Sequence, residues 1–215
     1  MKLIETELKG FLDLVDSKSP APGGGSVAAL SGALGVSLAR MVGHLTISKK
    51  KFLELPETVR TKFQIAMNAL EGCKNDFVRL IDADTDAFNL VMAAYQLPKV
   101  TEDEIRVRKA RILEGTISSI NVPKQVASTA NHALEVMGIV LEYGNQNTLS
   151  DQGVAVTQLF AAVEGAIYNI LINLPGLDDE ATKNTLKNEA NALLHRAKTL
   201  RDRMLENIET KLGVD

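Results

Sequence analysis

A carboxylate stands at position 84, where the surrounding pattern calls for an apolar residue. Between residues 57 and 96 apolar side chains alternate at spacings of four and three, and Asp84 falls between Leu80 and Ala87 on that helical face. Burying an uncompensated carboxylate costs on the order of several kcal/mol. We therefore expect Asp84 to be paired or to face a cavity. Burial raises a carboxyl pKa toward neutrality, which suits a general acid or base, and Asp82 is a second candidate.

A glycine-rich junction precedes the most apolar segment of the chain. Residues 19–26 read SPAPGGGS, in which Gly23, Gly24 and Gly25 carry no Cβ and can turn bare N–H groups toward a ligand. A helix that starts here adds unpaired N–H groups and partial positive charge, which favour an anion or an electron-rich carbonyl. Ser26 is either the N-cap of that helix or a hydroxyl offered to the ligand. The alternative is a connection that merely turns a corner.

Amide side chains on otherwise apolar elements point to the same kind of site. Asn169 and Asn173 follow Gly165 at intervals of four, so they share one helix face. A second group surrounds a predicted helix start and consists of Asn145, Asn147 and Asp151. Asparagine can orient a polar heterocycle without adding charge. Taken singly, each could instead satisfy a backbone group. We expect the amides and the two aspartates to line one cavity between helices.

Lysines follow the apolar segment consecutively. Lys49 and Lys50 make a local positive patch with Lys51, which favours a ligand that carries a carboxylate, although lysines at a helix C-terminus also offset the helix dipole. No Gly-Lys-Ser/Thr sequence follows the glycines and no strand precedes them, which excludes a P-loop and a dinucleotide-binding fold.

The composition restricts the class of protein. Of 215 residues, 45% are hydrophobic but only 4% aromatic, which is typical of closely packed helices. The net charge of −3 argues against a nucleic-acid partner.

A single cysteine, Cys73, excludes an internal disulfide and gives no metal-ligand spacing. No secretory signal is recognised, and Arg40 and His44 interrupt the one stretch that resembles a membrane span, so we expect a cytoplasmic protein that binds no membrane.

Helical periodicity predicts an all-α fold. The pattern gives helices over residues 2–16, 26–47, 57–96, 101–121, 123–143, 151–173 and 178–212. Thr101 and Glu104 form a capping box, Pro123 separates two helices, and Ser150 or Asp151 caps the next one. No linker divides the chain, so residues 1–215 are predicted to form one domain, a single orthogonal or up-down bundle of long helices. The alternative for residues 57–96 is a coiled-coil arm, which would favour an oligomer.

Several of these motifs together resemble the formiminotransferase-cyclodeaminase C-terminal domain family. They are the SPAPGGGSVAAL segment from Ser19, the lysines at 49–51, Asp84 before Ala87-Phe88, and the turn over residues 144–151. The resemblance covers nearly the full chain, except that Gln146 stands where many relatives have proline and Ser48 where glycine is frequent. It implies an all-helical, dimeric protein that acts on tetrahydrofolate and needs no cofactor beyond that substrate.

The resemblance also implies a reaction. In cyclodeamination N10 of 5-formiminotetrahydrofolate attacks the formimino carbon and ammonia leaves, which gives 5,10-methenyltetrahydrofolate. Asp84 would move the protons. The glycine turn with Ser26 would hold polar edges of the folate, the asparagines would bind the pterin or the reacting group, and Lys49 or Lys50 would meet the glutamate tail. Two alternatives stay open: methenyltetrahydrofolate cyclohydrolase activity, and a helical dimer that binds folate without catalysis.

Overall fold

Helices account for nearly all of the chain. In the computed structural model, which describes residues 2–214, they are η1 Leu3–Glu5, α1 Leu8–Val15, α2 Gly24–Ile47, α3 Lys50–Leu53, α4 Glu57–Tyr95, α5 Glu102–Tyr143, η2 Gln146–Thr148, α6 Leu149–Asn173, η3 Leu174–Gly176 and α7 Glu180–Leu212. Within that range there is no strand, so the predicted all-α class is confirmed.

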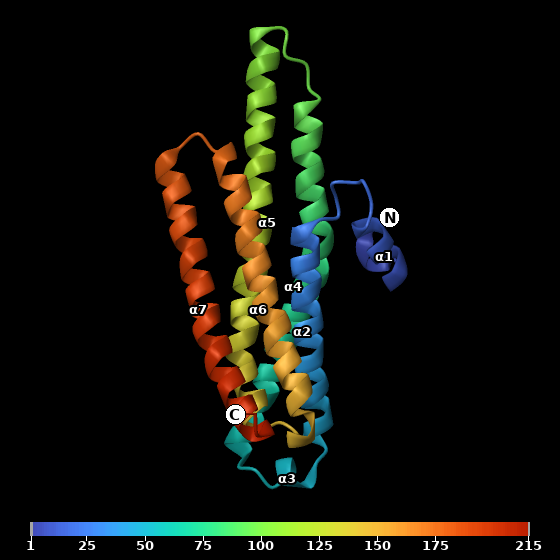
Figure 1. Ribbon diagram of the computed structural model, residues 1–215, viewed down its shortest axis with the longest axis vertical. Coiled ribbons are helices and arrows are strands. Elements are labelled where there is room, and N and C mark those ends of the chain that lie inside the picture. The colour runs from blue at the N-terminus through green and yellow to red at the C-terminus, as the bar shows by residue number, and fades with distance from the viewer. Residues whose placement is uncertain (1, 215) are drawn as a thin grey trace.

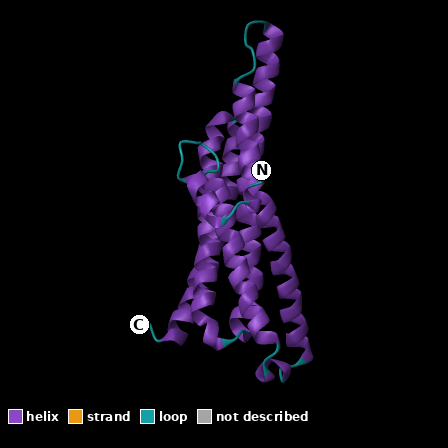
Figure 2. Ribbon diagram, turned by 90° about the vertical axis from the view of Figure 1, so that its right-hand side faces the viewer, coloured by secondary structure: helices purple, strands orange, loops and turns teal. Residues whose placement is uncertain are grey.

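The long helices pack side by side as an up-down bundle. Helix α2 lies between α4 and α6, α5 packs against α4 and α6, and α7 covers the outside of α5 and α6 (Figure 1). The last turns of α4 and the first turns of α5 extend past the other helices as a two-helix arm (Figure 2). A capping box at Thr101 and Glu104 starts α5, as predicted.

Helix α2 is central because its neighbours approach it closely. The ring of Phe77 on α4 occupies the place that a Cβ at Gly32 would take. On the α6 side, the Ala155 carbonyl and Leu159 leave no room for a side chain at Gly35. These contacts fix the positions of α4 and α6 along the axis of α2. They therefore determine which polar residues of the three helices lie next to one another.

Pro123 does not separate two helices, contrary to the sequence prediction. Helix α5 runs through it without interruption, and Pro123 is buried. Proline donates no N–H, so the carbonyl of Ser119 four residues earlier loses its helical partner. The side-chain Nδ2 of Asn173 on α6 donates to that carbonyl at 3.2 Å. The amide from α6 thus compensates for the missing bond.

Replacing Asn173 by alanine is expected to lower the free energy of unfolding by about 1–2 kcal/mol, because the Ser119 carbonyl then has no donor. In a Pro123→Ala background the same replacement should cost less, since alanine restores an N–H at position 123. Denaturant unfolding of the four proteins of this double-mutant cycle measures the difference. An equal cost in both backgrounds would contradict the role assigned to Asn173.

Two predicted helix starts were wrong. The segment over residues 2–16 is broken at Thr6, whose hydroxyl donates to the Leu3 carbonyl at 2.6 Å and so ends η1 before α1 begins. Helix α6 begins at Leu149 rather than after a Ser150 or Asp151 cap, because η2 leads directly into it and Thr148 takes the N-cap position.

Two segments are long and apolar enough to pass a length and composition test for membrane spans. They are Gly24–Ile47, with a mean hydropathy of 1.4, and Gln146–Gly176, with 1.5. Core helices of bundles pass the same test, and 56% and 50% of the respective windows are buried among the other helices.

Candidate functional site

Asp84 on α4 lies at the first turn of α2. Helix α2 begins at Gly24 with Gly23 as its N-cap, which excludes the first of the two roles expected for Ser26. The backbone N–H of Ser26 donates to Asp84 Oδ2 at 2.8 Å, and its hydroxyl donates to the Ile81 carbonyl at 2.8 Å and lies 3.2 Å from the same Oδ2. The Asp84 carboxylate from α4 therefore accepts the N–H group that a side chain at the N-cap of α2 would otherwise accept.

Gly25 allows this approach. A Cβ at Gly25 would overlap the Asp84 carboxylate, whereas at Gly24 it would meet only the end of the Asn169 side chain, at 3.2 Å from Nδ2. Of the three glycines, Gly25 is therefore the one that the contact between α2 and the carboxylate requires.

Replacing Gly25 by alanine is expected to displace Asp84 and to destabilise the fold by about 1–3 kcal/mol. The matched variant Gly24→Ala should be close to wild type, because a flexible amide can move aside. Thermal unfolding of the two variants tests this contrast. Similar behaviour of both would mean that the approach of Asp84 does not limit position 25.

Burial raises the pKa of the Asp84 carboxyl above its usual value, although the two hydrogen bonds from Ser26 act in the opposite direction. Both bonds reach Oδ2, and no described residue donates a hydrogen bond to Oδ1. Gly24 and Gly25 occupy the first turn of α2, where N–H groups have no acceptor within the helix. The Asp84 oxygen Oδ1, which can accept a proton, thus lies beside N–H groups of the first turn of α2 that have no acceptor within the helix.

Asn169 belongs to this group and Asn173 only borders it. The Nδ2 of Asn169 donates to the Gly165 carbonyl at 2.8 Å, which leaves its oxygen as an acceptor beside Gly24. Asn173 uses its amide on the carbonyls of Asn169 and Ser119. The predicted shared face of Gly165, Asn169 and Asn173 is confirmed, but the described contacts of Asn173 are structural.

Asp82 lies away from this group. Its Oδ1 accepts a hydrogen bond from the backbone N–H of Leu3 at 2.5 Å, so it holds the N-terminal segment against α4. Two positions along a helix correspond to a turn of about 200° about the axis, which places Asp82 on another face from Asp84.

The remaining predicted residues gather at the opposite end of α2. The N–H of Asn145 donates to the Thr46 hydroxyl at 2.9 Å, and the Asn145 side chain accepts from the N–H of Asn147 at 3.1 Å. Helix α2 has 24 residues and is thus about 36 Å long. The expectation of a single cavity is wrong within one chain. We call the two groups the Asp84 cluster (Gly23–Ser26, Asp84, Asn169) and the far cluster (Lys49, Lys50, Asn145, Asn147, Asp151).

Two polar residues were missed from sequence. The Thr85 hydroxyl lies 3.3 Å from the Ser26 hydroxyl and extends the Asp84 cluster. Gln152 on α6 is fully buried, none of the described residues hydrogen-bonds its side chain, and its Nε2 lies 3.4 Å from where a Cβ at Gly144 would stand. A glutamine among the apolar positions of α6 was the available signal for this residue.

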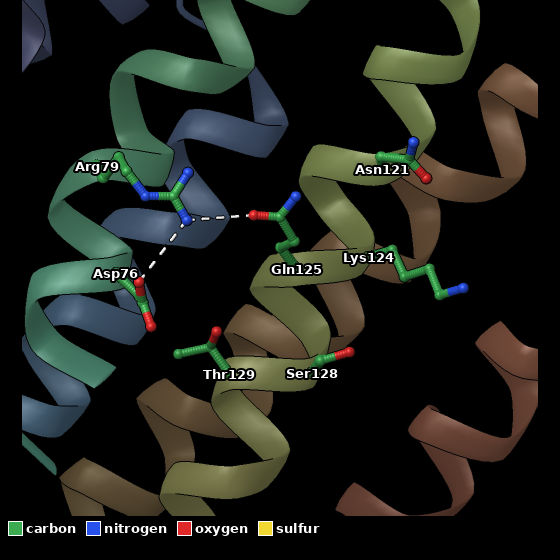
Figure 3. Close-up of a pocket in the computed structure, with 7 residues that line it drawn as sticks. All are labelled: Asp76, Arg79, Asn121, Lys124, Gln125, Ser128 and Thr129. Carbon is green, nitrogen blue, oxygen red and sulfur yellow. Dashed lines mark hydrogen bonds and ion pairs between the residues drawn. The ribbon is translucent and has the colours of Figure 1, made fainter. Parts of the chain in front are cut away.

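A hollow between α4 and α5 contains none of these residues. It has a volume of about 430 Å³, and Figure 3 shows Arg79 directed toward Gln125 and Asp76. The Arg79 guanidinium is 3.2 Å from the Gln125 oxygen and 3.7 Å from Asp76, and Lys124 pairs with Glu189. Its charges are therefore already compensated. Within residues 2–214, no three His, Cys, Asp or Glu side chains are grouped so that they could hold a metal ion.

Comparison with known proteins identifies the family. A family described as formiminotransferase-cyclodeaminase matches residues 7–192, a span that includes both clusters. The chain belongs to the formiminotransferase-cyclodeaminase family. This confirms the resemblance drawn from the sequence motifs.

Members of the formiminotransferase-cyclodeaminase family differ in length. A methenyltetrahydrofolate cyclohydrolase of Methylorubrum extorquens is 37% identical over 206 residues, which cover 96% of this chain and 97% of that protein. A formimidoyltransferase-cyclodeaminase of Mus musculus is 35% identical over 209 residues, and the matched part is 38% of its length. The crystal structure of a formiminotetrahydrofolate cyclodeaminase from Thermotoga maritima superposes with a TM-score of 0.74 at 27% identity, covering 97% of this chain and 98% of that one.

Proposed function

We propose that the protein is a tetrahydrofolate one-carbon enzyme that cyclises 5-formiminotetrahydrofolate to 5,10-methenyltetrahydrofolate and releases ammonia. The observation that carries this proposal is the Asp84 carboxyl, with raised pKa and one free oxygen, held at the first turn of α2 in a chain of this family. Such a group can first accept and then return a proton near neutral pH. The proposed reaction uses no cofactor besides the folate substrate.

Each bond change has a group to assist it. N10 forms a bond to the formimino carbon while Asp84 takes the N10 proton. Asp84 then passes this proton to the exocyclic nitrogen, which gains a second proton from solvent. The bond from carbon to that nitrogen breaks, ammonia leaves, and N5, carbon and N10 remain as the methenyl bridge. The N–H groups of Gly24 and Gly25, at the start of α2, and the oxygen of Asn169 beside Gly24 would orient the polar edge of the substrate.

A second copy of the chain completes this site in our proposal. Along α2 the exposed apolar residues Val27, Leu34 and Met41, at 38%, 51% and 37% exposure, recur every seven positions, and neighbouring α6 exposes Val154, Tyr168 and Ile172. An antiparallel pair about Leu34 would bury this face by placing Val27 opposite Met41. It would also bring the far cluster of one copy beside the Asp84 cluster of the other.

In such a homodimer the two clusters have separate tasks. The far-cluster residues Asn145, Asn147 and Asp151 would bind the pterin edge or the reacting group of the substrate held at Asp84. Lys49 and Lys50 would meet the carboxylates of the glutamate tail. Lys50 is exposed and makes only a 3.7 Å ion pair with Glu54 among the described residues, so its charge is accessible.

A second candidate function is methenyltetrahydrofolate cyclohydrolase activity. It is favoured by the full-length match to the Methylorubrum extorquens protein of that name. Here Asp84 would take one proton from water as the water oxygen bonds to the methenyl carbon, and would pass it to N5 as the bond from carbon to N5 breaks. The second proton of the water leaves to solvent as the formyl carbonyl forms, and the product is 10-formyltetrahydrofolate. The same group of residues and the same proton acceptor would serve both reactions.

Two assays on the purified protein separate these functions. Ammonia release from 5-formiminotetrahydrofolate, together with growth of the methenyl absorbance, supports cyclodeamination. Loss of methenyl absorbance from added 5,10-methenyltetrahydrofolate, beyond the rate without protein, supports cyclohydrolysis. Saturable tetrahydrofolate binding with neither activity would instead support a binding protein without catalysis, and absence of binding would refute a folate function altogether.

A further inference from the structure

One face of α4 packs along α2 and extends past the N-terminus of α2. Phe77 and Asp84 on this face fill the spaces at Gly32 and Gly25 of α2. In a regular helix Phe88 lies about 40° around the axis from Asp84 and about 6 Å further along it. Helix α2 begins at Gly24, whereas α4 continues past that point toward the arm (Figure 1). By helix geometry, Phe88 therefore lies on the same face of α4 but beyond the first turn of α2.

The ring of Phe88 is not used by the main core. Its neighbour Ala87 belongs to the buried core cluster, but Phe88 is only half-buried and is neither a member of that cluster nor packed against it within residues 2–214. The part of the Phe88 ring that stays exposed lies one helical turn beyond a proton-accepting carboxylate, where a flat ligand can pack on it.

We propose that Phe88 stacks on the aminobenzoyl ring that is bonded to N10 of the folate substrate. This inference rests on the proposed function, in which Asp84 takes the N10 proton. Since that ring is attached directly to N10, it must lie within a few ångströms of Asp84 when the proton moves. Asp84 and Phe88 then act on adjacent parts of one ligand, the first on the nitrogen and the second on the ring. Phe88 fixes the direction in which N10 approaches the formimino carbon.

The chain has no tryptophan, so a single introduced indole reports on this contact. In a Phe88→Trp variant, tetrahydrofolate should change the indole emission saturably. The matched control Leu90→Trp places the indole on the opposite, exposed side of α4 and should show no saturable change. Phe88→Leu should weaken tetrahydrofolate binding, measured by calorimetry, by about tenfold.

Each other outcome overturns the proposal in a distinguishable way. If the wild type binds tetrahydrofolate but Phe88→Trp gives no signal and Phe88→Leu binds equally well, only the role of Phe88 is wrong. If Phe88→Leu changes the elution volume in gel filtration and leaves the affinity of the remaining dimer intact, Phe88 contacts a second copy rather than the ligand. If the wild type does not bind tetrahydrofolate, the proposed function falls and this inference with it.

Discussion

Replacing Asp84 by asparagine is expected to lower kcat by about 10²- to 10⁴-fold, because the amide cannot accept the N10 proton. The fold should persist, since the asparagine oxygen can still accept the hydrogen bonds that Ser26 donates to Asp84. Tetrahydrofolate affinity should stay within a few-fold of wild type. Turnover, far-ultraviolet circular dichroism and calorimetric titration of the same preparation measure the three quantities.

The matched control is Asp82→Asn. Asp82 binds the N–H of Leu3 on another face of α4, so its loss should loosen the N-terminal segment without removing turnover. Near-normal turnover in Asp84→Asn would eliminate Asp84 as the proton acceptor. A loss of the same size in both variants would mean that the damage reaches the site through the structure rather than through proton transfer.

The raised pKa of Asp84 also fixes the sign of two pH effects. Turnover needs the carboxylate, so kcat/KM should fall on the acid side at a higher pH than an ordinary aspartate would give, and this limb should be absent from the residual activity of Asp84→Asn. The folded state holds the Asp84 proton more tightly than the unfolded chain. The contribution of Asp84 to the free energy of unfolding is therefore fully present below the pKa of the unfolded aspartate and is lost as the pH rises through the raised value.

The sequence singled out Asp84 and the glycines but did not show how they contact one another. Asp84 could be found because a carboxylate interrupts an apolar helical face, and the glycines because their backbone must approach something closely. The sequence did not show that Asp84 and the glycines are in contact, with Asp84 capping α2 in place of Ser26. This contact depends on how far α4 is shifted along α2, which periodicity within one helix does not report.

Pro123 was expected to separate two helices, and this was wrong because α5 continues through it. The Asn173 amide satisfies the carbonyl that Pro123 leaves without a donor. Helical periodicity reports which residues share a face of one helix but not what the next helix supplies. For the same reason the long helix α2 placed the Asp84 cluster and the far cluster at opposite ends, where the sequence had predicted a single cavity.

This separation leads to a complementation experiment. If the far cluster of one copy completes the Asp84 cluster of the other, a double variant with Asn147→Ala and Asp151→Ala should be nearly inactive by itself, as should Asp84→Asn. In a mixed dimer both defects fall in one site and the second site is intact. With random exchange of subunits half of the dimers are mixed, so activity should recover to about a quarter of the wild-type value.

The control for this experiment combines all three substitutions in one chain. When this triple variant is mixed with the Asp84→Asn chain, both sites of every dimer carry the Asp84 defect, and no activity should return. Recovery in the first mixture and not in the second requires a site shared between copies. If neither mixture recovers although native mass spectrometry shows mixed dimers, the two clusters do not cooperate across the interface. The far cluster would then have to act alone, about 36 Å from the Asp84 carboxyl, and could not contact a substrate bound there.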